Sequence, residues 1–145
     1  MELVIKHFGE LTVRELHDIL RLRSEIFVVE QNCVYQDIDG CDPHGYHLYL
    51  RDEDGIVAYL RVLPAGVRYA EVSLGRVVSA KRRRGHATRL LREGIAVARE
   101  KFGAESIMIG AQKYARALYE GVGFAPYGDD YLEDGIPHIH MRLDL

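Results

Sequence analysis

The sequence has 145 residues, of which 48% are hydrophobic and 28% are charged, and its formal net charge is -3. These values are typical of one ordinary globular domain and exclude disordered and collagen-like chains. The sequence pI near 6.2 also argues against a dedicated nucleic-acid-binding protein, because such proteins are usually basic overall.

The sequence gives no sign of secretion or of a membrane span. Residues 1–10 alternate apolar and charged side chains and lack the apolar h-region of a signal peptide. No apolar run approaches the roughly 20 residues that cross a bilayer. The cysteines, Cys33 and Cys41, lack the paired spacing of a zinc site, so we expect no metal. Reduced thiols in a cytoplasmic protein are the favoured interpretation, and a disulfide between them stays open.

The start of the chain predicts a strand, a long helix and a long loop. Residues 3–8 alternate as in a strand. Thr12 followed by Glu15 is a capping-box pattern, and apolar residues at helical spacing continue from there to Val28. Residues 30–45 are polar, rich in Asp and without period, which indicates a loop of the length that often carries function.

The next segment predicts a hairpin, a long strand and a second helix. Residues 46–50 and 56–63 flank the turn Asp52-Glu53-Asp54-Gly55, as in a β-hairpin. A strand over residues 67–79 follows, and its length suggests a bulge or bend. The helix after it has one apolar stripe and ends at Gly103, a typical residue just past a helix C-terminus.

The last third predicts a strand over 105–111, a short helix over 114–120, and two strands over 125–132 and 136–143. The order β-α-β-β-β-α-β-α-β-β contains no linker or repeat. We therefore expect residues 1–145 to form a single α/β (α+β) domain around one mixed sheet, with a parallel strand–helix–strand crossover in its second half.

The most informative local feature is a basic turn at residues 81–87, between a strand and a helix. Unpaired backbone N–H groups and the positive end of the macrodipole make a helix N-terminus a good phosphate site. Gly85 and Ala87 keep side-chain bulk away from such an anion. The glycine spacings of the P-loop and of the dinucleotide fingerprint are both absent. The residues alone thus indicate an anion at a helix start, with a solvated basic turn as the competing interpretation.

A family resemblance extends this interpretation. The segment Arg82-Arg83-Arg84-Gly85-His86-Ala87 resembles the R/Q-x-x-G-x-G/A signature of the GCN5-related N-acetyltransferase (GNAT) superfamily, although Ala87 stands where glycine is more common. Segments such as Tyr35-Gln36-Asp37-Ile38-Asp39-Gly40 and Asp134-Gly135-Ile136-Pro137-His138-Ile139 make nearly the whole chain similar to the ElaA-type subgroup. The resemblance implies the acyl-CoA N-acyltransferase fold: a mixed, mostly antiparallel, twisted sheet with helices on both faces. It also implies that acetyl-CoA binds between splayed fourth and fifth strands.

The resemblance assigns roles residue by residue. The fourth strand would pair with the pantetheine arm, and the loop after it would hold the pyrophosphate; these positions are Val77, Val78, Ser79, Arg82, Arg83, Arg84, Gly85, His86, Ala87 and Thr88. Tyr119 resembles the general acid of the family, since a phenol can protonate a leaving thiolate, and an aromatic that only packs a short helix is the alternative. The oxyanion donor would be the backbone N–H of Val77.

The general base is less clear from the sequence. Gly75 stands where some relatives carry a glutamate, and Glu71 lies earlier on the same strand. Glu30 is the preferred alternative as a base, although a surface charge near a helix end is the favoured interpretation of this residue. His47 and His138 are further candidates, because histidine exchanges protons near neutral pH, yet a lone histidine in a strand is more often structural.

The Asp-rich loop adds a hypothesis about the acceptor. Asp37, Asp39 and Asp42, together with Glu30, would attract a cationic amine or polyamine. A solvated Asp-rich turn is the competing interpretation of the same residues.

We therefore interpret the chain as an N-acetyltransferase in which a primary amine attacks the thioester of acetyl-CoA directly. A small-molecule amine, a peptide N-terminus and a lysine all stay open as acceptors, and a homodimer is a reasonable expectation. The alternatives are a non-catalytic acyl-CoA-binding sensor or interaction module, and an RNA-binding protein that uses the basic residues 81–84.

Overall fold

The computed structural model describes residues 1–82 and 84–145, so Arg83 of the predicted phosphate loop lies outside the described residues. The described strands form one sheet in the order β1-β2-β3-β4-β5-β7-β6. Neighbouring strands are antiparallel except for β4 and β5, which are parallel. The strands are β1 (Glu2–His7), β2 (Tyr46–Asp52), β3 (Gly55–Leu63), β4 (Val72–Ser79), β5 (Ser106–Gln112), β6 (Ala125–Glu133) and β7 (Ile136–Asp144).

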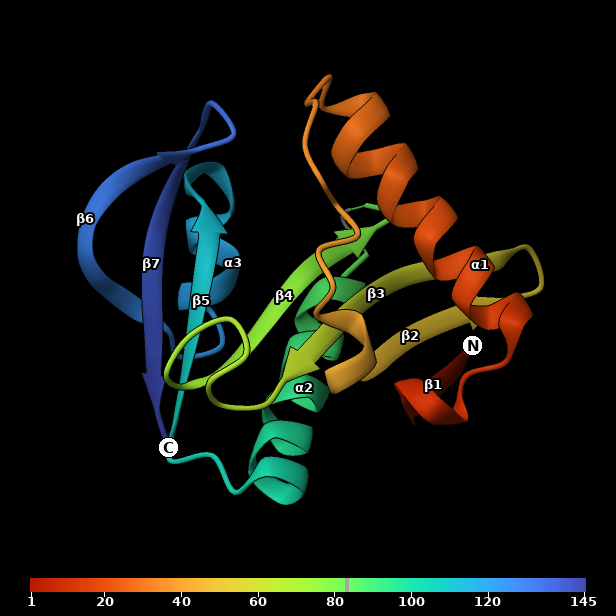
Figure 1. Cartoon of the computed structure of the whole chain (residues 1–145), viewed down its shortest axis with the longest axis horizontal. Coiled ribbons are helices and arrows are strands. Elements are labelled where there is room, and N and C mark those ends of the chain that lie inside the picture. The colour runs from red at the N-terminus through yellow and green to blue at the C-terminus, as the bar shows by residue number, and fades with distance from the viewer. Residues whose placement is uncertain (83) are drawn as a thin grey trace.

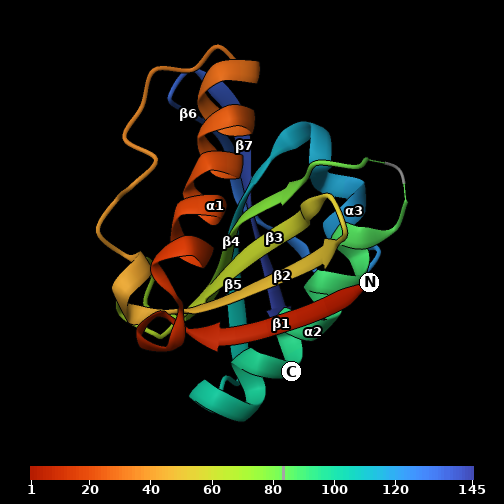
Figure 2. The ribbon, with the colours of Figure 1, turned by 90° about the vertical axis from the view of Figure 1, so that its right-hand side faces the viewer.

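Helices cover both faces of this sheet. Helix α1 (Val13–Arg23) lies on one face, and α2 (His86–Phe102) and α3 (Arg116–Glu120) lie on the other (Figures 1 and 2). The predicted architecture, a mixed and mostly antiparallel sheet with helices on both faces, is therefore confirmed. So is the parallel crossover, in which α2 connects β4 to β5.

The local signals at the helix ends explain where α1 and α2 start or stop. The Thr12 hydroxyl accepts a hydrogen bond from the Glu15 N–H at 3.0 Å, and the Glu15 carboxylate accepts one from the Thr12 N–H at 2.9 Å, which confirms the capping box. Gly103 adopts φ 60 at the end of α2, a conformation that glycine tolerates best. The first helix is not a single α-helix to Val28 as predicted, because it becomes a π-helix over Ser24–Glu30.

The core consists of one apolar layer on each face of the sheet. The larger layer packs the buried side chains of α2, such as Leu90 and Leu91, against β3 and β4. Gly94 lets α2 approach the sheet closely, since a Cβ there would lie 3.1 Å from the Leu60 side chain. The smaller layer joins Ile19 of α1 to Tyr59 of β3. Alternate residues of β3 thus serve opposite layers, as the period of a strand requires.

Strand β4 differs from the prediction at its start and then diverges from β5. It begins at Val72 rather than at residue 67, because the preceding segment turns, with the Gly66 N–H donating to the Tyr69 carbonyl at 2.7 Å. Pairing with β5 is recorded at Val72 and Ser73, near the start of β4, whereas β5 pairs with β7 along its whole length. The two parallel strands therefore splay toward their carboxyl ends.

Candidate active site

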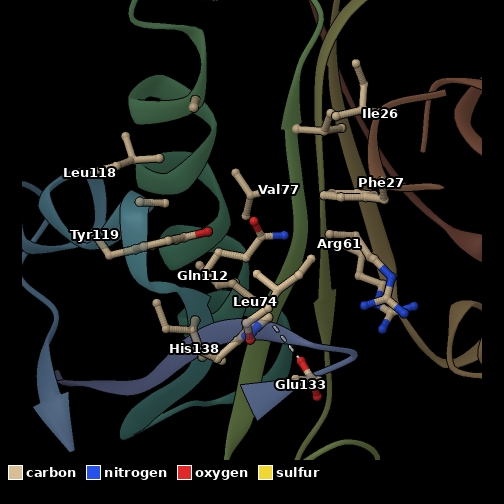
Figure 3. A pocket seen from close by; sticks show the side chains of 18 of the residues that line it. Ile26, Phe27, Arg61, Leu74, Val77, Gln112, Leu118, Tyr119, Glu133 and His138 are labelled. Carbon is tan, nitrogen blue, oxygen red and sulfur yellow. Dashed lines mark hydrogen bonds and ion pairs between the residues drawn. The ribbon is translucent and has the colours of Figure 1, made fainter. Parts of the chain in front are cut away.

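A cavity of about 320 Å³ lies where β4 and β5 part. Residues 73–79 of β4 form one wall, and the end of β5 with α3 forms the other. The π-helix and the turn between β6 and β7 close it (Figure 3). The lining residues that matter most below are Gln31, Arg68, Val77, Gln112, Tyr119 and His138.

A second hollow of about 300 Å³ adjoins this cavity at the start of α2. It is lined by Ser79, Arg82, Arg84, Gly85, His86, Ala87, Thr88 and Leu118. Ser79, Arg82, Ala87 and Leu118 also line the first cavity, so the two hollows lie next to each other. The structure therefore brings the described residues of the predicted cofactor set together, with Val77, Val78 and Ser79 on the wall of the first cavity.

The start of α2 has the shape that an anion site needs. Gly85 is the N-cap residue and adopts φ 75, in the left-handed region that glycine favours. A Cβ at Gly85 would meet no heavy atom within 4 Å, so the space in front of the helix start is open. The first backbone N–H groups of an α-helix have no partner inside the helix and can donate to a phosphate group in this space.

The bulge in β4 is held by Arg76. The register of β3 against β4 shifts between Tyr59 and Arg61, and Arg76 has φ 53, which costs a residue other than glycine about 1–2 kcal/mol. Its guanidinium donates to the Asp37 carbonyl at 3.1 Å and lies 2.9 Å from the Asp37 carboxylate. It also donates to the Asp39 carboxylate at 3.1 Å. The acidic loop thus fixes the strand conformation immediately before Val77.

The acidic loop is neutralised inside the protein, which contradicts both sequence interpretations of it. Asp37 and Asp42 are 7% and 4% exposed. Arg23, which is fully buried, lies 3.1 Å from the Asp37 carboxylate and 2.7 Å from that of Asp42. Arg61 binds Asp39 at 2.7 Å. Burial acts to raise the pKa of Asp39 and Asp42, but hydrogen bonds from the arginines outweigh it and lower both. The loop is neither a solvated turn nor a free anionic attractor for an amine.

Tyr119 presents a buried phenol to the cavity. The residue is 8% exposed and packs edge-on against Phe124, with ring centroids 6.2 Å apart. Its hydroxyl points from α3 into the cavity (Figure 3). Burial raises the pKa of this phenol well above its ordinary value, and Tyr114 adds to the effect. The group is therefore neutral and carries a proton at physiological pH.

The carboxylates considered as bases lie outside the cavity. Glu30 is exposed at the end of the π-helix, where its carboxylate pairs with Arg82 at 2.5 Å. Glu71 pairs with Arg142 at 3.3 Å. Neither is among the described residues that line the cavity, whereas Gly75 is. Glu30 therefore links the π-helix to Arg82 of the predicted phosphate loop, and its role as a base stays a prediction.

The two candidate histidines have different surroundings. His47 is fully buried: its Nε2 donates to the Asp42 carbonyl at 3.0 Å, its Nδ1 accepts from the Tyr59 hydroxyl at 2.8 Å, and burial lowers its pKa. His138 is 7% exposed and lines the cavity. His47 is thus a core residue, and His138 belongs to the site.

The sequence interpretation missed the far end of the cavity. There the Arg68 guanidinium donates to the Glu133 carboxylate at 2.7 Å, and Glu133 in turn lies 3.4 Å from His138. The side-chain amides of Gln31 and Gln112, which also line the cavity, hydrogen-bond to each other at 3.2 Å. The sequence prediction leaves Glu133 between the strands expected over 125–132 and 136–143 and gives it no role. An ionisable residue next to the Gly-Ile-Pro-His segment was the available signal.

Other features bear on the remaining sequence expectations. Cys33 and Cys41 carry free thiols. Across residues 1–82 and 84–145, no helix is both long and apolar enough to cross a membrane. The same residues contain no group of three or more His, Cys, Asp or Glu side chains placed to hold a metal ion.

Comparisons with known proteins agree with this geometry. Residues 16–145 match the profile of the family described as an acetyltransferase (GNAT) domain. A UPF0039 protein of Schizosaccharomyces pombe is 41% identical over 149 residues, covering 100% of this chain and 98% of that protein. A crystal structure of an acyl-CoA N-acyltransferase from Pseudomonas aeruginosa superposes with a TM-score of 0.91 at 37% identity, covering 99% of each chain. The Escherichia coli ElaA structure gives a TM-score of 0.88 at 36% identity, covering 99% of this chain and 100% of ElaA.

Proposed function

Because this chain belongs to the acetyltransferase (GNAT) domain family, we propose that it transfers an acetyl group from acetyl-CoA to a primary amine. One observation carries the proposal: two adjoining hollows lie along a line from the start of α2 to the gap between β4 and β5, and the buried hydroxyl of Tyr119 lines the second of them. An elongated donor with a phosphate end and a reactive end suits such a pair of hollows.

On the donor side, the residues present suit the parts of acetyl-CoA. The backbone N–H groups at the start of α2, with Arg82 and Arg84, suit the pyrophosphate. Beyond Ser73 the side of β4 that faces β5 lines the cavity instead of continuing the recorded ladder. Backbone groups on that edge need partners, and the amides of a pantetheine arm can supply them as an added strand would.

The chemistry then follows from two groups on opposite walls. The neutral amine attacks the thioester carbonyl, and the backbone N–H of Val77, which follows the bulge, donates to the oxyanion that forms. When the C–S bond breaks, the Tyr119 hydroxyl gives its proton to the sulfur, and the phenolate recovers a proton from the nitrogen. The products are the amide and CoA with a free thiol.

Two measurements test the proposal. Acetyl-CoA should raise the melting temperature, and the rise should grow with the logarithm of its concentration above Kd, because a ligand that binds only the folded state stabilises it. Thiol release should then follow with at least one member of a panel of alkylamines, polyamines, amino acids, and peptides with a free N-terminus or lysine. Tight binding without turnover on any amine would favour the sensor alternative. No thermal shift with acetyl-CoA would contradict the proposal.

The finer sequence predictions are carried forward in the same way. Propionyl-CoA and longer acyl-CoA donors in the same assay test whether acetyl is preferred. RNA binding through the basic residues at 81–84 would be weakened by salt and unaffected by acetyl-CoA, which separates it from the proposed function. A cytoplasmic location and a homodimer stay predictions.

A further inference from the structure

We propose that His138, paired with Glu133, accepts the proton that the acceptor ammonium must lose before it attacks the thioester. This inference rests on the proposed function and adds the group that the sequence left undefined. A primary amine is mostly protonated at neutral pH, and only its neutral form is a nucleophile. Glu133, Asp134 and His138 are the carboxylates and imidazoles among the described residues that line the cavity.

The hydrogen bonds of His138 leave one nitrogen free to accept a proton. Its Nδ1 lies 2.7 Å from the Ile136 carbonyl oxygen. Because a carbonyl can only accept, Nδ1 carries a proton and Nε2 carries the lone pair of the neutral ring. Nε2 lies 3.4 Å from the Glu133 carboxylate (Figure 3). A lone pair facing a carboxylate is unfavourable until a proton or a cation comes between them.

An ammonium group between these two side chains would give a hydrogen-bond donor to both the lone pair of His138 Nε2 and the Glu133 carboxylate. It can donate one hydrogen bond to His138 Nε2 and another to the Glu133 carboxylate, which Arg68 holds from its other oxygen at 2.7 Å. In the step itself one N–H bond of the ammonium breaks and one forms at Nε2. The products are a neutral amine, whose lone pair is free to attack, and an imidazolium paired with Glu133. The imidazolium returns its proton to solvent after the reaction.

The charges around His138 are consistent with this role. Glu133 faces it from the end of β6, Asp134 lies in the adjoining turn, and Arg68 reaches the pair from the loop before β4. Tyr131 of β6 lies against the ring, with centroids 5.7 Å apart, and stacks on His140 of β7 at 4.4 Å. The nearest charged partner of the imidazole is thus an anion, which can form an ion pair with the imidazolium that the step produces.

A pH–rate profile of acetyl transfer tests the inference with His138→Asn. The fastest amine of the panel and n-butylamine, a minimal acceptor, serve as substrates. We expect kcat/KM at neutral pH to fall on the order of 100-fold, the low end of what a general base contributes. The deficit should close as the pH approaches about 10, where an alkylamine loses its proton without help. Glu133→Gln should give a smaller deficit with the same pH dependence.

The matched control is His140→Asn, the same change two residues along β7, in a histidine that stacks on the same Tyr131. It should leave the profile unchanged. Calorimetric binding of CoA should be the same in all variants, which shows that they fold. A deficit in His138→Asn that is equal at every pH would overturn the inference and indicate a structural role. If His138→Asn acetylated amines with the same pH–rate profile as the wild type, only the inference about His138 would be overturned. If the wild-type protein acetylated no amine, the proposed function would be overturned as well.

Discussion

Burial determines what the Tyr119 hydroxyl can do. Because its pKa is raised, the phenol stays protonated at physiological pH. Its proton is therefore available for a leaving thiolate. We expect Tyr119→Phe to lower kcat by about 10²–10⁴-fold, with little change in the KM for acetyl-CoA, because the variant loses only the proton donor. Steady-state kinetics with the fastest amine measures both constants.

The control for this variant is Tyr127→Phe, which removes a hydroxyl from an exposed tyrosine of β6. It should behave as the wild type. If Tyr119→Phe kept full kcat, Tyr119 would be a packing residue, which is the alternative that its place on a short helix left open.

Gly75 offers a second test at the scale of single residues. It lines the cavity, and a Cβ there would meet no heavy atom within 4 Å, so a side chain can be added without a clash at that atom. In the His138→Asn background, Gly75→Glu should recover part of the lost kcat/KM at neutral pH, because it adds a carboxylate to the β4 wall. Gly75→Gln has nearly the same size and lacks the charge, so it should recover nothing. Equal effects of the two changes would contradict this expectation.

The sequence was sufficient for some site residues and insufficient for others. The resemblance singled out Tyr119 and the loop before α2, because each lies in a recognisable local pattern. It did not distinguish His138 from His47, because the two histidines differ only in the tertiary contacts of their side chains. Asp42 and Tyr59 occupy both nitrogens of His47, whereas one nitrogen of His138 faces the cavity beside Glu133.

At the scale of elements, the Asp-rich loop holds parts of the fold together through ion pairs of Asp37, Asp39 and Asp42 with arginines, and we call this ion-pair cluster the brace. The loop is long and acidic because it must supply carboxylates to arginines from α1, β3 and β4. Periodicity and composition could not reveal this, since Arg23, Arg61 and Arg76 are far apart in the sequence and converge only in the fold. Sequence patterns also could not show that the segment before Val72 turns, because a turning segment with apolar residues resembles a strand. For this reason the prediction started β4 at residue 67.

The brace makes a prediction about stability. Asp37→Ala should lower the free energy of unfolding by about 3–5 kcal/mol, because it leaves the buried Arg23 guanidinium without one of its two carboxylates. Asp18→Ala is the matched control. It removes a carboxylate from an exposed ion pair with Arg14 on α1 and should change stability by about 0.5 kcal/mol or less. Urea unfolding of the variants measures both, and equal losses would show that the brace contributes no more than a surface pair.

At the scale of the whole molecule, the site exists because the sheet is divided. Strands β1–β4 and β5–β7 are joined by a short parallel ladder at the start of β4 and β5, and beyond it the strands separate. The second half supplies Tyr119 and His138, and the first half supplies the β4 bulge and the brace behind it. The side-chain amides of Gln31 and Gln112, which both line the cavity, hydrogen-bond between the end of the π-helix and β5. The proposed reaction as a whole therefore uses groups from both halves.

The stability of the fold at low pH depends on Glu15, which connects α1 to β1 and β2. This carboxylate receives hydrogen bonds from Lys6 of β1, from the Thr12 N–H, and from the Tyr49 hydroxyl of β2. Burial acts to raise its pKa, but these hydrogen bonds outweigh burial and lower it from 4.5 to about 2. Because the folded pKa is the lower one, the stabilisation is complete above about pH 4.5 and is lost as the pH falls toward about 2.

Glu15→Gln should therefore be less stable than the wild type at neutral pH, and the difference should shrink as the pH falls from about 4.5 to about 2. Urea unfolding at a series of pH values measures this difference. Glu25→Gln, an identical change at an exposed position of the following π-helix, should show no such convergence. A gap between wild type and Glu15→Gln that stays constant down to about pH 2 would mean that the hydrogen bonds act equally on the neutral side chain, and that acid unfolding starts elsewhere. The half-buried Asp39 and the buried Asp42, whose pKa values are also lowered, are where it would then start.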